Sequence, residues 1–221
     1  MAISTFNTFL AWGATPYGLS KKVVIKDFPD IGGAPELIEK TTLEDSMQTY
    51  ILGIQSSGSM EFTFNFTKSE YAAVAIGAKT DMYYAISFGN SGVFRWQGKH
   101  DIYLTGKGVN EVVEAKIVIA PSTKPEYSDM GVLLVSCADA DGAGETTVTV
   151  TQALEDGYKY MYQVGETITA PDYNDDVSSW ADMTTNPDDI ATTNGYIIGV
   201  ALVDETDEQV LAYGEAAAVV A

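Results

Sequence analysis

The chain has 221 residues, enough for one large domain or two modest ones, and 46% of them are hydrophobic. With 11% aromatic residues as well, it can bury a core, which a disordered protein of net charge −19 could not. Its longest apolar stretches, such as 130–135, are far too short to span a bilayer, and the N-terminal segment lacks the pattern of a secretory signal. We therefore expect a folded protein with no membrane partner.

The charge is distributed unevenly along the chain. Residues 1–125 carry 11 basic and 12 acidic residues, a net of −1, whereas residues 126–221 carry only Lys159 against 19 acidic residues, a net of −18. This step predicts two domains, 1–125 and 126–221, joined by a linker at 121–125 that begins and ends with proline. The acidic half would repel a phosphate backbone and is interpreted as a solvated surface.

The N-terminal half is predicted to consist of strands with one helix. Residues 22–28 are rich in β-branched side chains and end at a Pro-Asp-Ile-Gly-Gly turn. Residues 34–59 show no sustained period, so we expect a long connection that is functional or ordered by a partner. In residues 60–66, apolar and polar side chains alternate, which is typical of a half-buried strand.

A helix is expected over about residues 67–79. Thr67 and Glu70 have the spacing of a capping box, in which hydroxyl and carboxylate satisfy backbone amides reciprocally. The apolar stripe of this helix is expected to contain Tyr71, Val74, Ala75 and Ala78. Further strands are predicted at 82–88, 93–97, 100–105 and 109–119, with a turn at 89–92.

The C-terminal half is predicted to be a small antiparallel β domain. The candidate strands are 131–138, 146–151, 159–164, 196–203 and 209–212, and glycine and aspartate turns separate them. Regular short strands of this kind indicate a sandwich or barrel. The predicted fold class is therefore mainly β, with one α-helix.

Few residues point to chemistry. The single histidine, His100, has no arrangement of a nucleophile and an orienting acid around it, so a structural role is favoured. Cys137 lies in a strand-like segment and is interpreted as a buried, inert thiol. The Gly-Lys-Gly segment 106–108 lacks the spacing of a phosphate loop, and a hairpin turn explains it better. We expect no enzyme activity and no cofactor.

The acidic segment 172–176 is the one arrangement that could bind a metal. Asp172, Asn174 and Asp176 match the first ligands of an EF-hand loop, but Val177 and Met183 occupy positions that require glycine and glutamate. An EF-hand is excluded on this pattern. A looser calcium site and a plain acidic turn both stay open.

Residues 26–66 resemble the major tail proteins, or tail tube proteins, of long-tailed phages (siphophages), especially those infecting Gram-positive bacteria. The resemblance rests on four segments: Lys26-Asp-Phe-Pro-Asp-Ile-Gly-Gly-Ala-Pro-Glu, Glu39-Lys-Thr-Thr-Leu-Glu-Asp, Gln48-Thr-Tyr-Ile-Leu-Gly-Ile-Gln and Met60-Glu-Phe-Thr-Phe. The family order continues with a helix and a final long strand. The similarity covers about residues 15–121.

The resemblance implies a tail-tube β-sandwich or barrel flanked by one helix. It implies a virion structural protein that assembles into hexameric rings, which stack into a tube and conduct genomic DNA during ejection without binding it specifically. The other partners it implies are the tape measure protein, the tail terminator and the initiator complex. The connection 34–59 would contact the neighbouring ring, through Glu36, Leu37, Thr41, Thr42, Leu43, Tyr50, Ile51, Gly53 and Ile54.

The acidic half resembles domains appended to the C-terminus of some phage tail and head proteins. The resemblance implies a position on the tube exterior, where its charge would keep tubes from bundling. An alternative is a virion surface module that binds carbohydrate and mediates host adhesion, a reading that Trp180 and the many tyrosines keep open.

Overall fold

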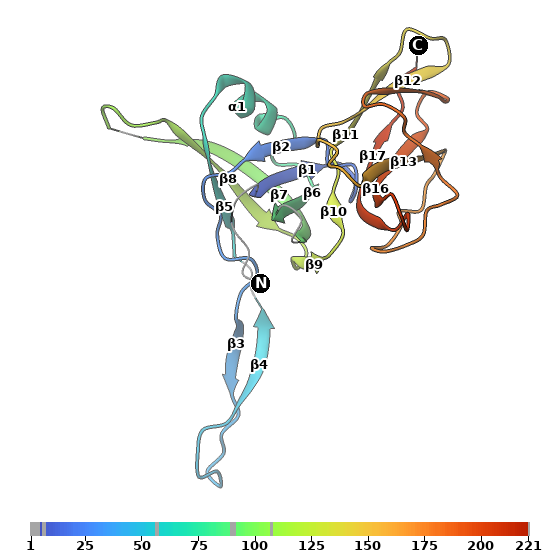
Figure 1. Ribbon diagram of the computed structural model, residues 1–221. Coiled ribbons are helices and arrows are strands. Elements are labelled where there is room, and N and C mark those ends of the chain that lie inside the picture. Colours follow the sequence, from blue (N-terminus) through green and yellow to red (C-terminus); the bar gives the residue numbers. More distant parts are fainter. Residues whose placement is uncertain (1–4, 6–7, 56–57, 89–91, 107, 221) are drawn as a thin grey trace. The chain divides into compact units, whose positions relative to one another are not determined.

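The fold was analysed in a computed structural model, shown in Figure 1, which describes residues 5, 8–55, 58–88, 92–106 and 108–220. Strands dominate, and one helix is present in the described part of the chain, so the prediction of a mainly β protein is confirmed. Residues 89–91 of the expected turn at 89–92, and Lys107 of the expected hairpin turn, lie outside the described residues. The chain divides into two compact units, residues 1–25, 81–95 and 126–221 (unit 1) and residues 26–80 and 96–125 (unit 2).

Unit 2 is an antiparallel sheet with a helix and a long hairpin. Its strands are β3 (Pro35–Glu39), β4 (Tyr50–Gln55), β5 (Met60–Asn65), most of β7 (Val93–Thr105) and β8 (Glu114–Pro121). β8 pairs on one side with β5, where Phe62 lies opposite Ile117, and on the other with β7, where Ile102 lies opposite Ile117. Met60, Phe62 and Phe64 are buried, as the alternation of 60–66 predicts, and Phe62 stacks on Trp96 with ring centroids 6.1 Å apart.

Helix α1 (Lys68–Ala75) is shorter than expected. The Thr67 hydroxyl accepts from the Glu70 amide at 3.2 Å, as in a capping box. The same hydroxyl also donates to the Glu70 carboxylate, so this carboxylate binds the Thr67 side chain where a full capping box would have it bind the Thr67 backbone amide. The helix ends at Ala75, because Ile76 has an extended backbone conformation and Gly77 and Lys79 have left-handed ones. Val74 is the helix's buried residue, Ala75 is exposed and Ala78 lies beyond the end of the helix, so the predicted stripe is wrong at Ala75 and Ala78.

In unit 1, the strands from the N-terminal part of the chain pair antiparallel, with β1 between β2 and β6. β1 (Thr8–Gly13) pairs antiparallel with β2 (Lys21–Val24) and with β6 (Met82–Phe88), and β9 (Glu126–Ser128) pairs with the start of β7. Sequence patterns did not predict β1. Buried Ala11, Leu19, Ala85 and Val93 pack in one cluster with Val132 and Leu134. The first strands of unit 1 and the chain after residue 130 therefore share a core.

The rest of unit 1 is built from the acidic C-terminal segment. One sheet has the strand order β10-β17-β16-β13-β14, and the second has the order β11-β12-β15. The bounds are β10 Gly131–Val132, β11 Val135–Asp139, β12 Glu145–Val150, β13 Tyr158–Gly165, β14 Ala181–Asp182, β15 Asp188–Ala191, β16 Ile197–Asp204 and β17 Val210–Ala217. Both sheets contribute to a buried cluster that includes Val148, Tyr160 and Val200. Four of the five expected C-terminal strands are present with shifted bounds, as β12, β13, β16 and β17. The fifth, 131–138, is divided into β10 and β11 in different sheets, and β10 pairs parallel with β17, whereas an antiparallel domain was expected. The turn glycines Gly144, Gly157 and Gly195 have positive φ.

The expected linker 121–125 is not a free connection. The amides of Ser122 and Thr123 donate to the Gln97 carbonyl at 2.7 and 3.2 Å, and the Gln97 amide donates to the Thr123 hydroxyl at 2.8 Å. Division into units also differs from the linear boundary at 125, because residues 1–25 and 81–95 group with 126–221. The distribution of charge along a sequence does not show which strands pair. The units differ from the predicted domains because strands from residues 1–25 and 81–95 pair with one another and pack with residues after 130.

Candidate assembly surface

The segment 34–59 contains an antiparallel hairpin and not the irregular connection that we expected. β3 and β4 pair with Leu37 opposite Leu52 and Ile38 opposite Ile51, and the ribbon extends away from β5 and β8 of the same unit (Figure 1). Opposed residues share a face and successive residues alternate, so Leu37 and Leu52 lie on one face and Ile38 and Ile51 on the other. Both faces are thus apolar, which is why no alternation is visible in the sequence.

The hairpin tip is held by side chain to backbone hydrogen bonds. The Asp45 carboxylate accepts from the Thr42 amide at 2.8 Å and from the Thr42 hydroxyl at 3.1 Å, and the Thr41 hydroxyl accepts from the Thr49 amide at 3.0 Å. This local turn presents Leu43 to solvent with a relative exposure of 108%. A tip that is ordered by its own polar groups has no need of Leu43 for its folding.

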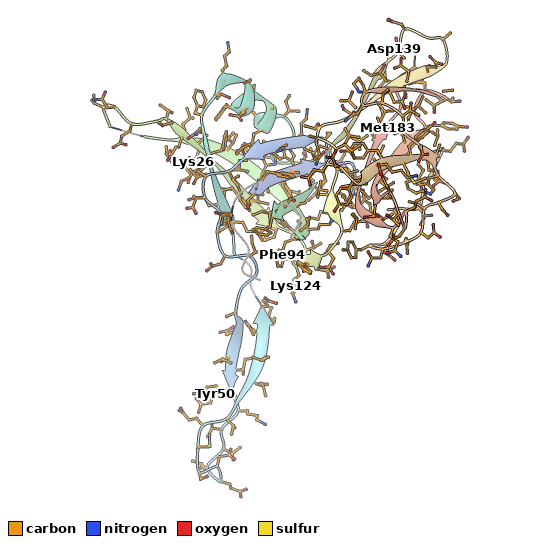
Figure 2. All side chains as sticks on the ribbon, in the orientation of Figure 1. Lys26, Tyr50, Phe94, Lys124, Asp139 and Met183 are labelled. Carbon is orange, nitrogen blue, oxygen red and sulfur yellow. The ribbon has the colours of Figure 1, made fainter. Side chains whose placement is uncertain are left out.

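The structure places the nine predicted contact residues on this one hairpin. Leu37, Leu43, Tyr50, Ile51 and Ile54 are large, apolar and exposed, and Ile54 reaches 87%. Thr41 is half-buried, Glu36 and Thr42 are exposed, and Gly53 lies under Ile38, whose Cδ1 would be 3.0 Å from an added Cβ. Tyr50 stands near the far end of the ribbon (Figure 2). These residues are accessible for contact, and their role between neighbouring rings stays a prediction.

Sequence reasoning missed two members of the surface and a second apolar projection. Met47 and Leu52 on the β3–β4 hairpin are more than two-thirds exposed. At the connection between β7 and β8, Val109 is 93% exposed, and Leu104, Val112 and Val113 are also exposed. In both places, apolar residues inside polar segments of the sequence could have indicated an exposed apolar surface. Residues 109–113 were instead assigned to a strand, and that strand begins at Glu114.

The sheet face opposite the core of unit 2 is polar and carries paired charges. Lys116 on β8 forms an ion pair with Glu61 on β5, and the Tyr103 hydroxyl on β7 donates to the same carboxylate at 2.6 Å. The hydrogen bond from Lys116, and then that from Tyr103, lowers the pKa of Glu61 below its ordinary value. Lys26 is likewise paired with Glu114. Two lysines on this face are therefore matched by carboxylates.

The residues considered for chemistry have structural partners. His100 is buried, and its Nε2 lies 2.8 Å from the Val74 carbonyl oxygen, so its ring links β7 to helix α1. Cys137 is half-buried and not fully buried as expected, and this burial raises the pKa of its thiol to about 11. A thiol with such a pKa is almost entirely protonated at neutral pH and is a poor nucleophile.

The acidic segment 172–176 forms a turn whose carboxylates bind backbone amides. Asp175 accepts from the Asp172 amide at 2.8 Å, and Asp176 accepts from the Ser178 amide at 2.8 Å, which lowers the pKa of Asp176. Among the described residues, no group of His, Cys, Asp or Glu has an arrangement that could hold a metal ion. The described part of the chain also has no helix capable of crossing a membrane.

Comparison of the chain with protein-family models and with curated proteins finds no match.

Proposed function

We propose that this chain is a structural subunit of a phage tail tube, in which hexameric rings stack and conduct DNA from capsid to host. The observation that carries the proposal is the β3–β4 hairpin, whose two faces and tip all expose large apolar side chains. Contiguous exposed apolar surface of this kind marks an interaction site. The sequence resemblance in the same residues supplies the class of assembly.

The hairpin suits contact with further copies of the chain. An isolated two-stranded ribbon is marginally stable in water, and here its side chains have no core of their own to enter. If the ribbon inserts between subunits of the neighbouring ring, Leu37 and Leu52 are covered on one side and Ile38 and Ile51 on the other. Ring closure would use sheet edges, because an unpaired edge is a template for pairing with another chain.

Passage of DNA requires a wall that does not retain phosphate. Counterion release makes each free lysine or arginine beside a phosphate a source of affinity. The pairing of Lys116 with Glu61 and of Lys26 with Glu114 reduces this attraction on the polar face of unit 2.

The further partners proposed are the tape measure protein, the tail terminator and the initiator complex. The acidic surface is proposed to face outward and to limit the bundling of tubes.

The test is tube formation by the purified chain, followed by electron microscopy after concentration or addition of an initiator complex. Leu43→Asp combined with Tyr50→Asp should abolish tubes and leave the monomer folded, because each aspartate would place a desolvated charge in the contact. Leu154→Asp, also at an exposed leucine but outside the hairpin, is the control and should assemble normally. Tubes formed by the double variant, or none formed by the unmodified chain under either condition, would contradict the proposal.

A further inference from the structure

Unit 1 contains a cleft of about 570 Å³ that the tube proposal does not use. It is lined by residues from β13, β16 and β17, from the segments 129–133 and 151–155, and by Phe9, Lys22 and Tyr173. A volume in this range is typical of sites for small ligands. All of the lining residues belong to the same unit, so the cleft depends on one packed body.

Four aromatic rings contribute to the lining: Phe9, Tyr158, Tyr160 and Tyr173. Tyr160 is buried and its hydroxyl donates to the Gln152 carbonyl at 3.0 Å, which fixes this ring in the wall. Tyr158 is half-buried and Tyr173 is 43% exposed, and neither hydroxyl has a hydrogen-bond partner among the residues described. The cleft thus offers aromatic ring faces beside hydroxyl groups that are free to bind a ligand.

Hydrogen bonds of Gln152 hold two lining segments of the cleft together. The Gln152 side chain donates to the Val132 carbonyl at 2.8 Å and accepts from the Leu134 amide at 3.0 Å, which ties the segment after β12 to the residues around β10. Lys22 Nζ lies 4.3 Å from the centroid of the Phe9 ring. A preorganised wall reduces the entropy that a ligand loses on binding.

Charge restricts the class of ligand. Lys22 is the single basic residue of the lining, against Asp129 and Glu155, and residues 126–221 carry a net charge of −18. Such a field opposes the approach of anions. The Asp129 carboxylate accepts from the Tyr127 hydroxyl at 2.6 Å, and the lining of the cleft, with Lys22 against Asp129 and Glu155, carries a net charge of −1, which also disfavours anions.

We propose that this cleft binds a neutral saccharide. The C–H faces of a pyranose ring could stack on the rings of Tyr158 and Tyr173 that line the cleft, and its hydroxyls could bond the tyrosine hydroxyls, Thr151 and Glu155. Trp180 lies outside the cleft, because it packs against Tyr213 with ring centroids 6.2 Å apart. The inference goes beyond the tube proposal and does not depend on it, since it concerns the unassembled chain.

The experiment is an NMR titration of the full-length monomer with three neutral probes, cellotriose, mannotriose and the trisaccharide of N-acetylglucosamine. At least one should give saturable shifts at Tyr158, Tyr173 and Leu202 at concentrations up to about 10 mM. Tyr173→Ala should weaken that binding at least about fivefold, because one stacking face is lost. Tyr103→Ala, at a similarly exposed tyrosine in unit 2, should bind as the unmodified chain does.

Two charged probes distinguish a saccharide site from an electrostatic one. Digalacturonate should bind more weakly than the neutral probes, and spermidine should cause no saturable shifts at the cleft tyrosines. The proposal is overturned if none of the three neutral probes binds, if a charged probe binds more tightly than all of them, or if Tyr173→Ala and Tyr103→Ala behave alike. Tube formation plays no part in the readout, so failure here leaves the proposed function intact.

Discussion

At the scale of single residues, polar and titratable groups of this protein are used to fix backbone and sheet positions. His100 bonds the Val74 carbonyl, Asp176 caps the Ser178 amide, and Arg95 donates to the Pro16 and Gly131 carbonyls at 3.2 and 3.3 Å. Desolvation lowers the pKa of Arg95, although its guanidinium stays charged because the ordinary value is so high. The contacts of His100 and Arg95 were beyond prediction, since they join residues distant in sequence, whereas the contact of Asp176 with Ser178 is local.

The Glu61 carboxylate gives a prediction of pH dependence. Its pKa is lowered in the folded chain by the hydrogen bonds from Lys116 and Tyr103, so its stabilising effect is complete above the ordinary value of 4.5 and is lost as pH falls through the folded value. Glu61→Gln should lower the Tm at pH 7 by about 1–2 °C, a small effect because the pair is exposed to solvent. The Tm difference should be smaller at pH 3 than at pH 7, because the stabilising effect is lost as the carboxylate becomes protonated.

The control for this substitution is Glu44→Gln on the β3–β4 hairpin, whose carboxylate makes no ion pair with a described residue. It should leave the Tm unchanged at both pH values. A Tm difference for Glu61→Gln that persists unchanged at pH 3 would show that the effect does not come from the ionised carboxylate.

At the scale of elements, the alternation of apolar and polar residues predicted a strand correctly where one face of that strand is buried. β5 was predicted within one residue because its buried and exposed positions alternate. β7 was predicted as two strands divided near Gly98, yet it is continuous: Gly98 is needed because an added Cβ would lie 2.5 Å from the Ala120 carbonyl oxygen of β8. The β3–β4 hairpin was missed because neither face is buried, so it lacks the period by which strands are recognised.

Hydrogen exchange should distinguish the β3–β4 hairpin, which packs on no core, from strands that have a buried face. In the monomer, amides of β3 and β4 should exchange faster than those of β5 and β8, because the ribbon has no core and its opening exposes little additional apolar surface. In assembled tubes, the same amides should become protected. Protection of the hairpin equal to that of β5 in a proven monomer would show that its apolar side chains are already covered, and would contradict their proposed role between rings.

At the scale of the molecule, the chain returns to unit 1 after building unit 2. Leu134 packs with Ala11, Leu19 and Val93, whereas its neighbour Leu133 packs in a cluster formed entirely by residues 133–218. The predicted domain boundary at 125 therefore assigns residues of one shared core to two different domains. Whether residues 126–221 form an independent domain stays a prediction.

A comparison of Leu134→Ala with Leu133→Ala tests that shared core. In the full chain, each should lower the free energy of unfolding by about 2–5 kcal/mol, as expected for a buried leucine. In an isolated chain of residues 126–221, Leu134→Ala should cost less than about 1 kcal/mol, because all its buried partners except Val132 are absent. Leu133→Ala should cost as much as before. Chemical denaturation measures all four values.

Equal costs of Leu134→Ala in the two chains would contradict the shared core and favour a self-sufficient C-terminal domain. If the isolated chain does not fold, residues 1–25 and 81–95 are required for it, and the linear boundary is wrong for that reason.

The sequence by itself determined the mainly β class, the position of β5, the start of the helix and the turns at Gly144, Gly157 and Gly195. These features depend on local periodicity, on capping and on backbone conformations that only certain residues adopt. Only the tertiary structure decided the pairing of β1 with β6, the β3–β4 hairpin, the continuity of β7 and the packing of Leu134 on the first strands. Each of these is a contact between residues far apart in the chain, or a strand with no buried face, and neither leaves a periodic signal in sequence.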